Sequence, residues 1–170
     1  LLISVFIFFF QLRYLSVKDP GYNSENRMLI RVSPALEFKY NTYIEELKKI
    51  PGIISISGNG SAFGQTVGMS MIDDDTGEGI PVMGYFVEDD FFEAYGIDLL
   101  QGKTFSQTSG VDTGKVIIDE AGVDILGLDN PVGKKISTSS LKEVEIIGVV
   151  ENADLIARKG ERKPLLYTQF

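Results

Sequence analysis

The first ten residues, Leu1–Phe10, carry no charge, and this apolar run limits what the chain can be more than any other feature. Ten helical residues rise about 15 Å, roughly half the thickness of a hydrocarbon core. The run is therefore too short to span a bilayer by itself. We interpret it as the C-terminal part of a transmembrane helix that begins before residue 1. A signal-peptide remnant and a buried core helix or strand are the alternatives.

The apolar run ends in residues that suit a membrane interface. Residues 11–14 read QLRY, and Arg and Tyr side chains reach the level of the lipid headgroups. We expect the helix to continue to about Val17, because Pro20 disfavours helix in the residue before it. This predicts two parts: 1–17, the end of a transmembrane helix and its exit, and 18–170, an extracytoplasmic core domain.

The composition of the chain excludes several classes of function. The sequence contains no cysteine and no histidine, so thiol nucleophiles, disulfides, thiolate zinc sites and imidazole acid–base catalysis are all absent. Its formal net charge of −8 disfavours nucleic acid as a partner, because phosphate binding needs a basic surface. We therefore expect no catalytic residues, no metal site and no cofactor.

Hydrophobic periodicity predicts a strand–helix–strand unit near the start of the domain. Residues 28–32 (MLIRV) and 53–57 (IISIS) are strand candidates. Between them, apolar residues recur at spacings of three and four, which is typical of an amphipathic helix: Leu36, Tyr40, Tyr43, Ile44, Leu47 and Ile50. Ser33–Pro34 suits the start of that helix, and Pro51–Gly52 suits its end.

The rest of the domain mixes hairpins with short helices. Residues 66–87 predict a β-hairpin, and 91–95 predict a short helix that Asp89 or Asp90 could cap, with Glu93 as the reciprocal partner. Strands are expected at 116–118 and 144–150, and Asp119 should cap a helix that runs to about Leu126. We predict an α+β fold of mixed sheets with short helices. It could form two subdomains, about 22–57 with 115–170, and 58–114.

Two motifs resemble ligand sites, and we favour a simpler interpretation of both. The loop 58–64 contains the pattern G-x-G-x-x-x-G, but a segment with strand period follows it, whereas a phosphate-binding loop needs a helix there. The acidic run 73–78 lacks the glycine and the distal bidentate acid of an EF-hand. We interpret the first as a loop and the second as a solvated hairpin tip.

Acidic residues nevertheless gather in the middle of the sequence. Nine acids and no Lys or Arg lie between Lys49 and Lys103. An ordinary solvated face explains them, and a surface for a basic partner is the functional alternative. The candidate residues for such a partner surface are Asp73, Asp74, Asp75, Glu78, Glu88 and Asp89.

Three runs in the second half of the chain resemble a known family. Val87–Phe105 (VEDDFFEAYGIDLLQGKTF), Val116–Lys134 and Ile146–Val150 are similar, in the same order, to motifs of MacB-type periplasmic core domains of MacB/FtsX-like ABC transporter permeases, especially Bacteroidetes-like members. One departure stands out after the last run. The family often continues with Asp-Phe-x-Phe, where this chain has Asn152–Leu155 (NADL).

The resemblance implies a location and a function. It implies a permease of the inner membrane with four transmembrane helices, in which this domain is periplasmic and lies between the first and the second. It also implies a cytoplasmic ABC ATPase as partner, a permease dimer and an envelope partner protein. ATP hydrolysis would take place in the separate ATPase, and this domain would transmit the resulting motion to a periplasmic substrate or partner.

Two other functions stay open at this point. A passive binding module for a peptide, a lipid or an antibiotic would need an apolar groove near 58–64 or 66–87. An enzyme would need a cleft with convergent ionisable groups, which the sequence does not indicate.

Overall fold

The computed structural model describes residues 2–17, 19–33, 36, 39–58, 60, 66–72, 78–105, 114–155 and 162–169. Its helices are α1 (Leu2–Val17), α3 (Tyr40–Lys48), α4 (Phe91–Tyr95) and α5 (Glu120–Ile125). Its strands are β1 (Val67–Ile72), β2 (Gly79–Val87), β3 (Leu99–Gly102), β4 (Lys115–Asp119), β5 (Lys135–Thr138), β6 (Lys142–Val150) and β7 (Leu165–Gln169). The α+β class predicted from the sequence is confirmed.

All seven strands belong to one mixed sheet with the order β3-β6-β4-β7-β2-β1-β5. The pairs β2–β7 and β4–β6 are parallel, and the other pairs are antiparallel. One edge of β6 pairs with β5 through Lys142–Glu145 and with β3 through Gly148–Val150. Because β5 also pairs with β1, the hydrogen-bonded strands from β6 through β4, β7, β2, β1 and β5 form a closed ring.

The sheet separates two apolar clusters, and neighbouring residues of one strand point into different clusters. In β4, Ile117 packs in the first cluster, whereas Val116 and Ile118 pack in the second. The first cluster also holds Phe91 and Phe92 of α4, both fully or almost fully buried. This alternation follows from the two-residue period of a strand. It shows that both faces of the central strands are covered.

The hairpin and the two short helices form where the sequence predicts them. β1 and β2 pair antiparallel from Val67 opposite Gly84 to Ile72 opposite Gly79. Asp119 caps α5, since its Oδ1 accepts a hydrogen bond of 2.9 Å from the N–H of Gly122. Helix α4 ends at Gly96 in the left-handed conformation (φ 61°), which glycine adopts readily.

The predicted cap of α4 is wrong. Asp90 occupies the N-cap position, but its side chain makes no capping hydrogen bond. Asp89 instead accepts a hydrogen bond from the side-chain amide of Gln169 at the end of β7, and Glu93 accepts one of 2.9 Å from the hydroxyl of Thr104. These contacts with distant parts of the chain take both carboxylates away from the orphan amides of the short helix.

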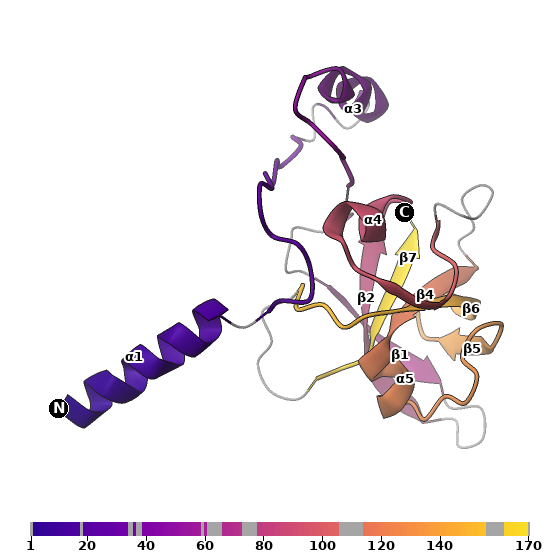
Figure 1. Cartoon of the computed structure of the whole chain (residues 1–170). Helices are drawn as coiled ribbons and strands as arrows, with labels where there is room; N and C mark the ends of the chain where they lie inside the picture. Colours follow the sequence, from indigo (N-terminus) through magenta and orange to yellow (C-terminus); the bar gives the residue numbers. More distant parts are fainter. Residues whose placement is uncertain are drawn as a thin grey trace.

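The strand–helix–strand prediction for 28–57 is confirmed only for its helix. Residues 28–33 and 53–58 are not strands, and neither segment joins the sheet. Helix α3 spans Tyr40–Lys48, and none of its residues is buried. Leu36 is helical too, while the predicted start at Pro34 lies outside the described residues. Figure 1 shows α3 standing apart from the sheet. A strand needs a neighbouring strand, and within the described residues these segments have none.

Helix α1 projects away from the sheet at the other end of the molecule (Figure 1). Its described side chains, from Ile3 to Tyr14, are all exposed. A shallow apolar groove along it is lined by Ile3, Phe6, Ile7, Phe10, Gln11 and Tyr14. No helix among the described residues combines the length and the apolar character needed to cross a membrane.

Candidate functional site

The most distinctive feature outside the sheet is the attachment of residues 19–27, here called the docking segment, to the folded domain. Helix α1 ends at Val17, and the docking segment then runs along one margin of the domain on its way to α3 (Figure 1). Two backbone hydrogen bonds hold it. The N–H of Asp154 donates to the carbonyl of Pro20 at 2.7 Å, and the N–H of Asn23 donates to the carbonyl of Tyr95 at 2.8 Å. The docking segment is therefore clamped from two separate parts of the chain.

Local turns shape the docking segment for this contact. The N–H of Gly21 donates to the carboxylate of Asp19 at 2.9 Å, and the N–H of Glu25 donates to the side-chain oxygen of Asn23 at 2.9 Å. Asp and Asn side chains favour such turns because they bind the backbone two residues on. Gly21 has a φ of 72°, which a residue with a Cβ atom rarely adopts.

Aromatic side chains hold the other end of the docking segment. The ring of Tyr95 stacks on Phe91, which is fully buried, with a centroid distance of 4.5 Å. Tyr22 approaches the same ring edge-on at 6.0 Å, and the guanidinium of Arg27 lies over it at 4.8 Å. Burial raises the pKa of the Tyr95 hydroxyl, an effect that the charge of Arg27 partly opposes. A cation over an aromatic face contributes about 0.5–1 kcal/mol at a partly exposed position.

Residues 152–155, which follow β6, are the surface on which the N-terminal end of the docking segment lies. Ala153 and Leu155 are buried in the first cluster, while Asn152 and Asp154 between them make polar contacts. A Cβ atom on Gly21 would come within 3.0 Å of the carbonyl oxygen of Asn152. This resolves the path of the segment at which the sequence departs from the family pattern: small and aliphatic residues fill the two buried positions.

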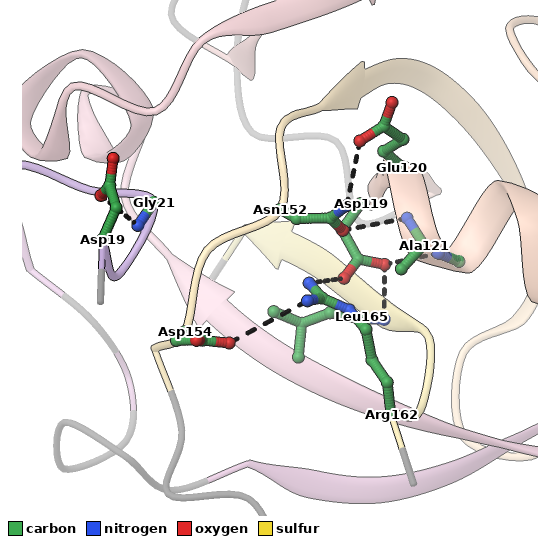
Figure 2. A network of polar contacts seen from close by, with 10 residues as sticks. Asp19, Gly21, Asp119, Glu120, Ala121, Asn152, Asp154, Arg162 and Leu165 are labelled. Atoms are coloured by element: carbon green, nitrogen blue, oxygen red, sulfur yellow. Dashed lines mark hydrogen bonds and ion pairs between the residues drawn. The ribbon is translucent and has the colours of Figure 1, made fainter. Parts of the chain in front are cut away.

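Asn152 also ties this segment to the start of α5, as Figure 2 shows. Its side-chain oxygen accepts from the N–H of Ala121 at 3.0 Å, and its amide nitrogen donates to Glu120 at 3.0 Å. The first amides of a helix have no partner inside the helix. Asn152 supplies one, so the position of 152–155 depends on that of α5.

A buried ion pair lies beside these contacts (Figure 2). Asp119 is fully buried at the end of β4, and its Oδ2 accepts from Nη2 of Arg162 at 2.9 Å. Its Oδ1 accepts from the N–H groups of Gly122 at 2.9 Å and Leu165 at 3.1 Å. Nη1 of Arg162 lies 3.9 Å from the carboxylate of Asp154. A buried carboxylate is tolerated when its charge and lone pairs are satisfied in this way.

The residues predicted for an acidic partner surface do not all come together. Asp73, Asp74 and Asp75 lie outside the described residues. Glu88 and Asp89 follow the end of β2, whereas Glu78 precedes its start, and a nine-residue strand separates them by about 30 Å.

Glu88 and Asp89 make contacts within the chain. The carboxylate of Glu88 accepts from the N–H of Gly58 at 2.6 Å and binds the hydroxyl of Tyr40 in α3. Burial, together with this hydrogen bond and the charge of Glu88, raises the pKa of Tyr40 well above its usual value. Binding of a partner by the acidic residues stays a prediction.

No cluster of side chains with an obvious chemical task is found in the described part of the chain. No group of three or more His, Cys, Asp or Glu residues there is placed to hold a metal ion. The polar residues that do converge, around Asp119 and Asp154, contact one another through Arg162, whose Nε is buried without a hydrogen-bond partner in the described part of the chain. What the described residues show is a docking segment, after an apolar helix, that is hydrogen-bonded to the folded domain.

Sequence reasoning missed part of this arrangement. The sequence predicts Asp119 as a helix cap but indicates no ionic partner for it, and it assigns no role to Arg162. The available signal was an arginine just before a strand whose residues are apolar enough to be buried on both faces. Nothing in the local sequence pairs it with a residue 43 positions away.

The fold and the attached helix define a class of protein: an α+β domain with a mixed sheet, preceded by an apolar N-terminal helix. Comparison with known families then places it. The family described as MacB-like periplasmic core domain matches residues 5–164, and the chain belongs to this family. A search of curated protein sequences gave no significant match.

Solved structures show the same fold. The periplasmic region of MacB from Actinobacillus actinomycetemcomitans matches with a TM-score of 0.52 and 22% identity, over 76% of this chain and 54% of that one. The extracellular domain of the noncanonical ABC-type transporter YknZ from Gram-positive bacteria matches with a TM-score of 0.53 and 16% identity, over 89% of this chain and 65% of that one. The chain thus spans between about half and two thirds of these structures.

Proposed function

We propose that this chain is the extracytoplasmic domain of an ABC transporter permease subunit, and that it couples ATP-driven motion of transmembrane helices to a periplasmic substrate or partner. The docking segment carries the proposal. It connects α1 to the sheet through backbone hydrogen bonds on two sides, so that a displacement of α1 is passed on to the domain. Family membership and the fold of the MacB and YknZ domains support the transporter context.

Helix α1 takes the role of the membrane connection in this proposal. We propose that residues 1–17 are the C-terminal part of the first transmembrane helix and that 18–170 form the periplasmic domain, held at the inner membrane. The apolar residues of α1 are exposed on all sides, with Ile3 76% and Phe6 62% exposed, which is costly in water and favourable in lipid. The proposed partners are a cytoplasmic ABC ATPase, a second permease subunit and an envelope protein.

The test is to loosen the connection without touching the fold. Three glycines are inserted between Lys18 and Asp19 in the full permease. The permease is reconstituted with its ATPase, and both subunits carry a spin label at Glu143. In the unmodified protein, ATP should change the distance between the labels. In the insertion variant, ATP hydrolysis should continue while the distance change is lost. An unaltered distance change in the insertion variant would refute the proposal.

A second candidate function, passive binding of a peptide or lipid, is favoured by one observation. Apolar residues around α3 are exposed, among them Met28 at 83% and Ile54 at 100%. Such a patch is typical of a surface that meets another molecule. If the insertion variant still binds the peptide or lipid, with the same affinity in the presence and absence of ATP, passive binding would be favoured over coupling.

A further inference from the structure

The side chain of Arg162 lies between two carboxylates that belong to different parts of the structure. Its Nη2 lies 2.9 Å from Oδ2 of Asp119, at the end of β4, and its Nη1 lies 3.9 Å from Oδ1 of Asp154. The guanidinium group is planar and rigid, so its two nitrogens keep a fixed separation. Arg162 thus sets the position of Asp154 relative to that of Asp119.

Each of the two carboxylates leads to a different element. Asp119 is fully buried, and it also accepts hydrogen bonds from Gly122 in α5 and Leu165 at the start of β7. Strand β7 lies in the interior of the sheet between β4 and β2. On the other side, the backbone N–H of Asp154 binds the carbonyl of Pro20 in the docking segment. Figure 2 shows Arg162 between Asp119 and Asp154.

We infer that Arg162 is the positioning residue that locks the docking segment to the sheet, by bridging Asp119 and Asp154. A displacement of Pro20 pulls on Asp154, and the guanidinium passes it to Asp119 and from there to α5 and β7. This path runs through the hydrogen bonds of Asp154 and Asp119 and through the ion pair of 3.9 Å between Arg162 and Asp154. Such a network of contacts can carry coupling. The inference rests on the proposed function for its purpose, but the lock itself can be tested without transport.

Replacing Arg162 by lysine distinguishes a bridge that holds both carboxylates from simple compensation of the charge of Asp119. Lysine keeps a positive charge beside buried Asp119, but a single ammonium cannot hold two carboxylates in a fixed geometry. Arg162→Lys should therefore preserve the folded sheet and still release Asp154. Arg162→Gln should weaken both the folded sheet and the attachment of Asp154. Lys135→Gln, which breaks the exposed pair of Lys135 with Glu143, is the matched control.

The measurement is amide hydrogen exchange in the full permease, since exchange reports local opening separately from global unfolding. The reporters are the N–H groups of Asp154 and Asn23, which bind the docking segment or belong to it, and Ile118 serves as the reference for the sheet. In Arg162→Lys, the N–H of Asp154 should exchange about tenfold faster while Ile118 stays unchanged. Asn23, which binds Tyr95, shows whether the release spreads to the second contact of the docking segment. Lys135→Gln should alter none of the three.

Two results would overturn the inference. The first is unchanged protection of Asp154 in Arg162→Lys, and the second is an equal loss of protection at Ile118, which would mean general destabilisation. If neither Arg162 variant folds, Asp154→Lys decides, because it places like charges together and leaves the pair of Asp119 intact. The backbone N–H at position 154 should then exchange faster, and retained protection of that N–H would overturn the inference. If the exchange results show that Arg162 locks the docking segment but the glycine-insertion variant keeps its ATP-driven distance change, only the proposed function is refuted.

Discussion

Gly21 lies so close to the carbonyl oxygen of Asn152 that a Cβ atom there would come within 3.0 Å of it, a separation that proteins essentially never show. The docking segment therefore packs backbone against backbone on the residues that follow β6. A side chain at this point would push the two apart. The contact explains why a glycine follows Pro20, since the φ of 72° and the lack of space both require it.

Replacing Gly21 by alanine should detach the docking segment. The variant Gly52→Ala is the control, because Gly52 also has a positive φ (96°) but a Cβ atom there would have no neighbouring atom within 4 Å. Both variants share the backbone strain, so the difference between them isolates the clash, which we expect to cost about 1–3 kcal/mol. Trypsin cleavage after Arg27 should be about tenfold faster in Gly21→Ala than in Gly52→Ala. Equal rates would contradict the close packing described for Gly21.

Removing the buried carboxylate should destabilise the whole sheet. Asp119→Ala leaves Arg162 without its buried anion and Leu165 without the acceptor of its N–H group. Breaking a buried pair on one side typically costs about 3–5 kcal/mol. We expect a loss of this order in the free energy of unfolding, measured by urea titration of the protein in detergent.

The control for this measurement is Lys135→Ala, which removes an ion pair on the surface. Exposed pairs contribute little, because water and salt screen them. Its unfolding midpoint should stay close to that of the original protein. If Asp119→Ala were equally well tolerated, Asp119 would not be the anchor of α5 and β7.

The contact of α3 with the domain should depend on pH in the alkaline range. The pKa of Tyr40 is raised in the folded protein, by burial first and by Glu88 second, relative to about 10 in an unfolded chain. A raised pKa means that the folded state favours the neutral hydroxyl. The stabilisation is therefore complete below about pH 10 and is lost as the pH rises through the folded-state value.

Tyrosinate absorbance checks this directly. Titration of the protein and of Tyr40→Phe should differ by one tyrosine whose ionisation is centred above the usual value of about 10. Glu88→Gln, which removes the charge but keeps an acceptor, should bring that ionisation to lower pH. A difference curve centred near pH 10 would show that Tyr40 does not contact Glu88 in solution.

The sequence predicts those elements whose signals are local. The hairpin 66–87 follows from alternation, and the cap of α5 follows from an aspartate before a short apolar helix. Strand β7 was missed for a physical reason. All five of its residues are buried, because both faces of the sheet are covered there, and a strand of that kind loses the polar–apolar alternation.

The remaining differences come from contacts between distant residues. The segments 28–32 and 53–57 have the composition of strands, but strand formation depends on a partner that local sequence does not specify. Likewise, Asp90 suits a cap by residue type, while Asp89 beside it binds Gln169, 80 positions along the chain. The bridge through Arg162 is of the same kind: its residue types were visible, but its geometry was not.

Coupling through this domain requires a rigid connection between α1 and the sheet, and a distance distribution measures that rigidity. The 170-residue chain has no cysteine, so labels can be attached at two introduced cysteines, Tyr14→Cys on α1 and Glu143→Cys on β6, both exposed positions. Pulsed electron resonance of the permease in lipid nanodiscs, with doubly labelled subunits diluted by unlabelled ones, should give one narrow distribution. A broad distribution, as a flexible tether between Val17 and the sheet produces, would contradict the coupling proposed for this domain.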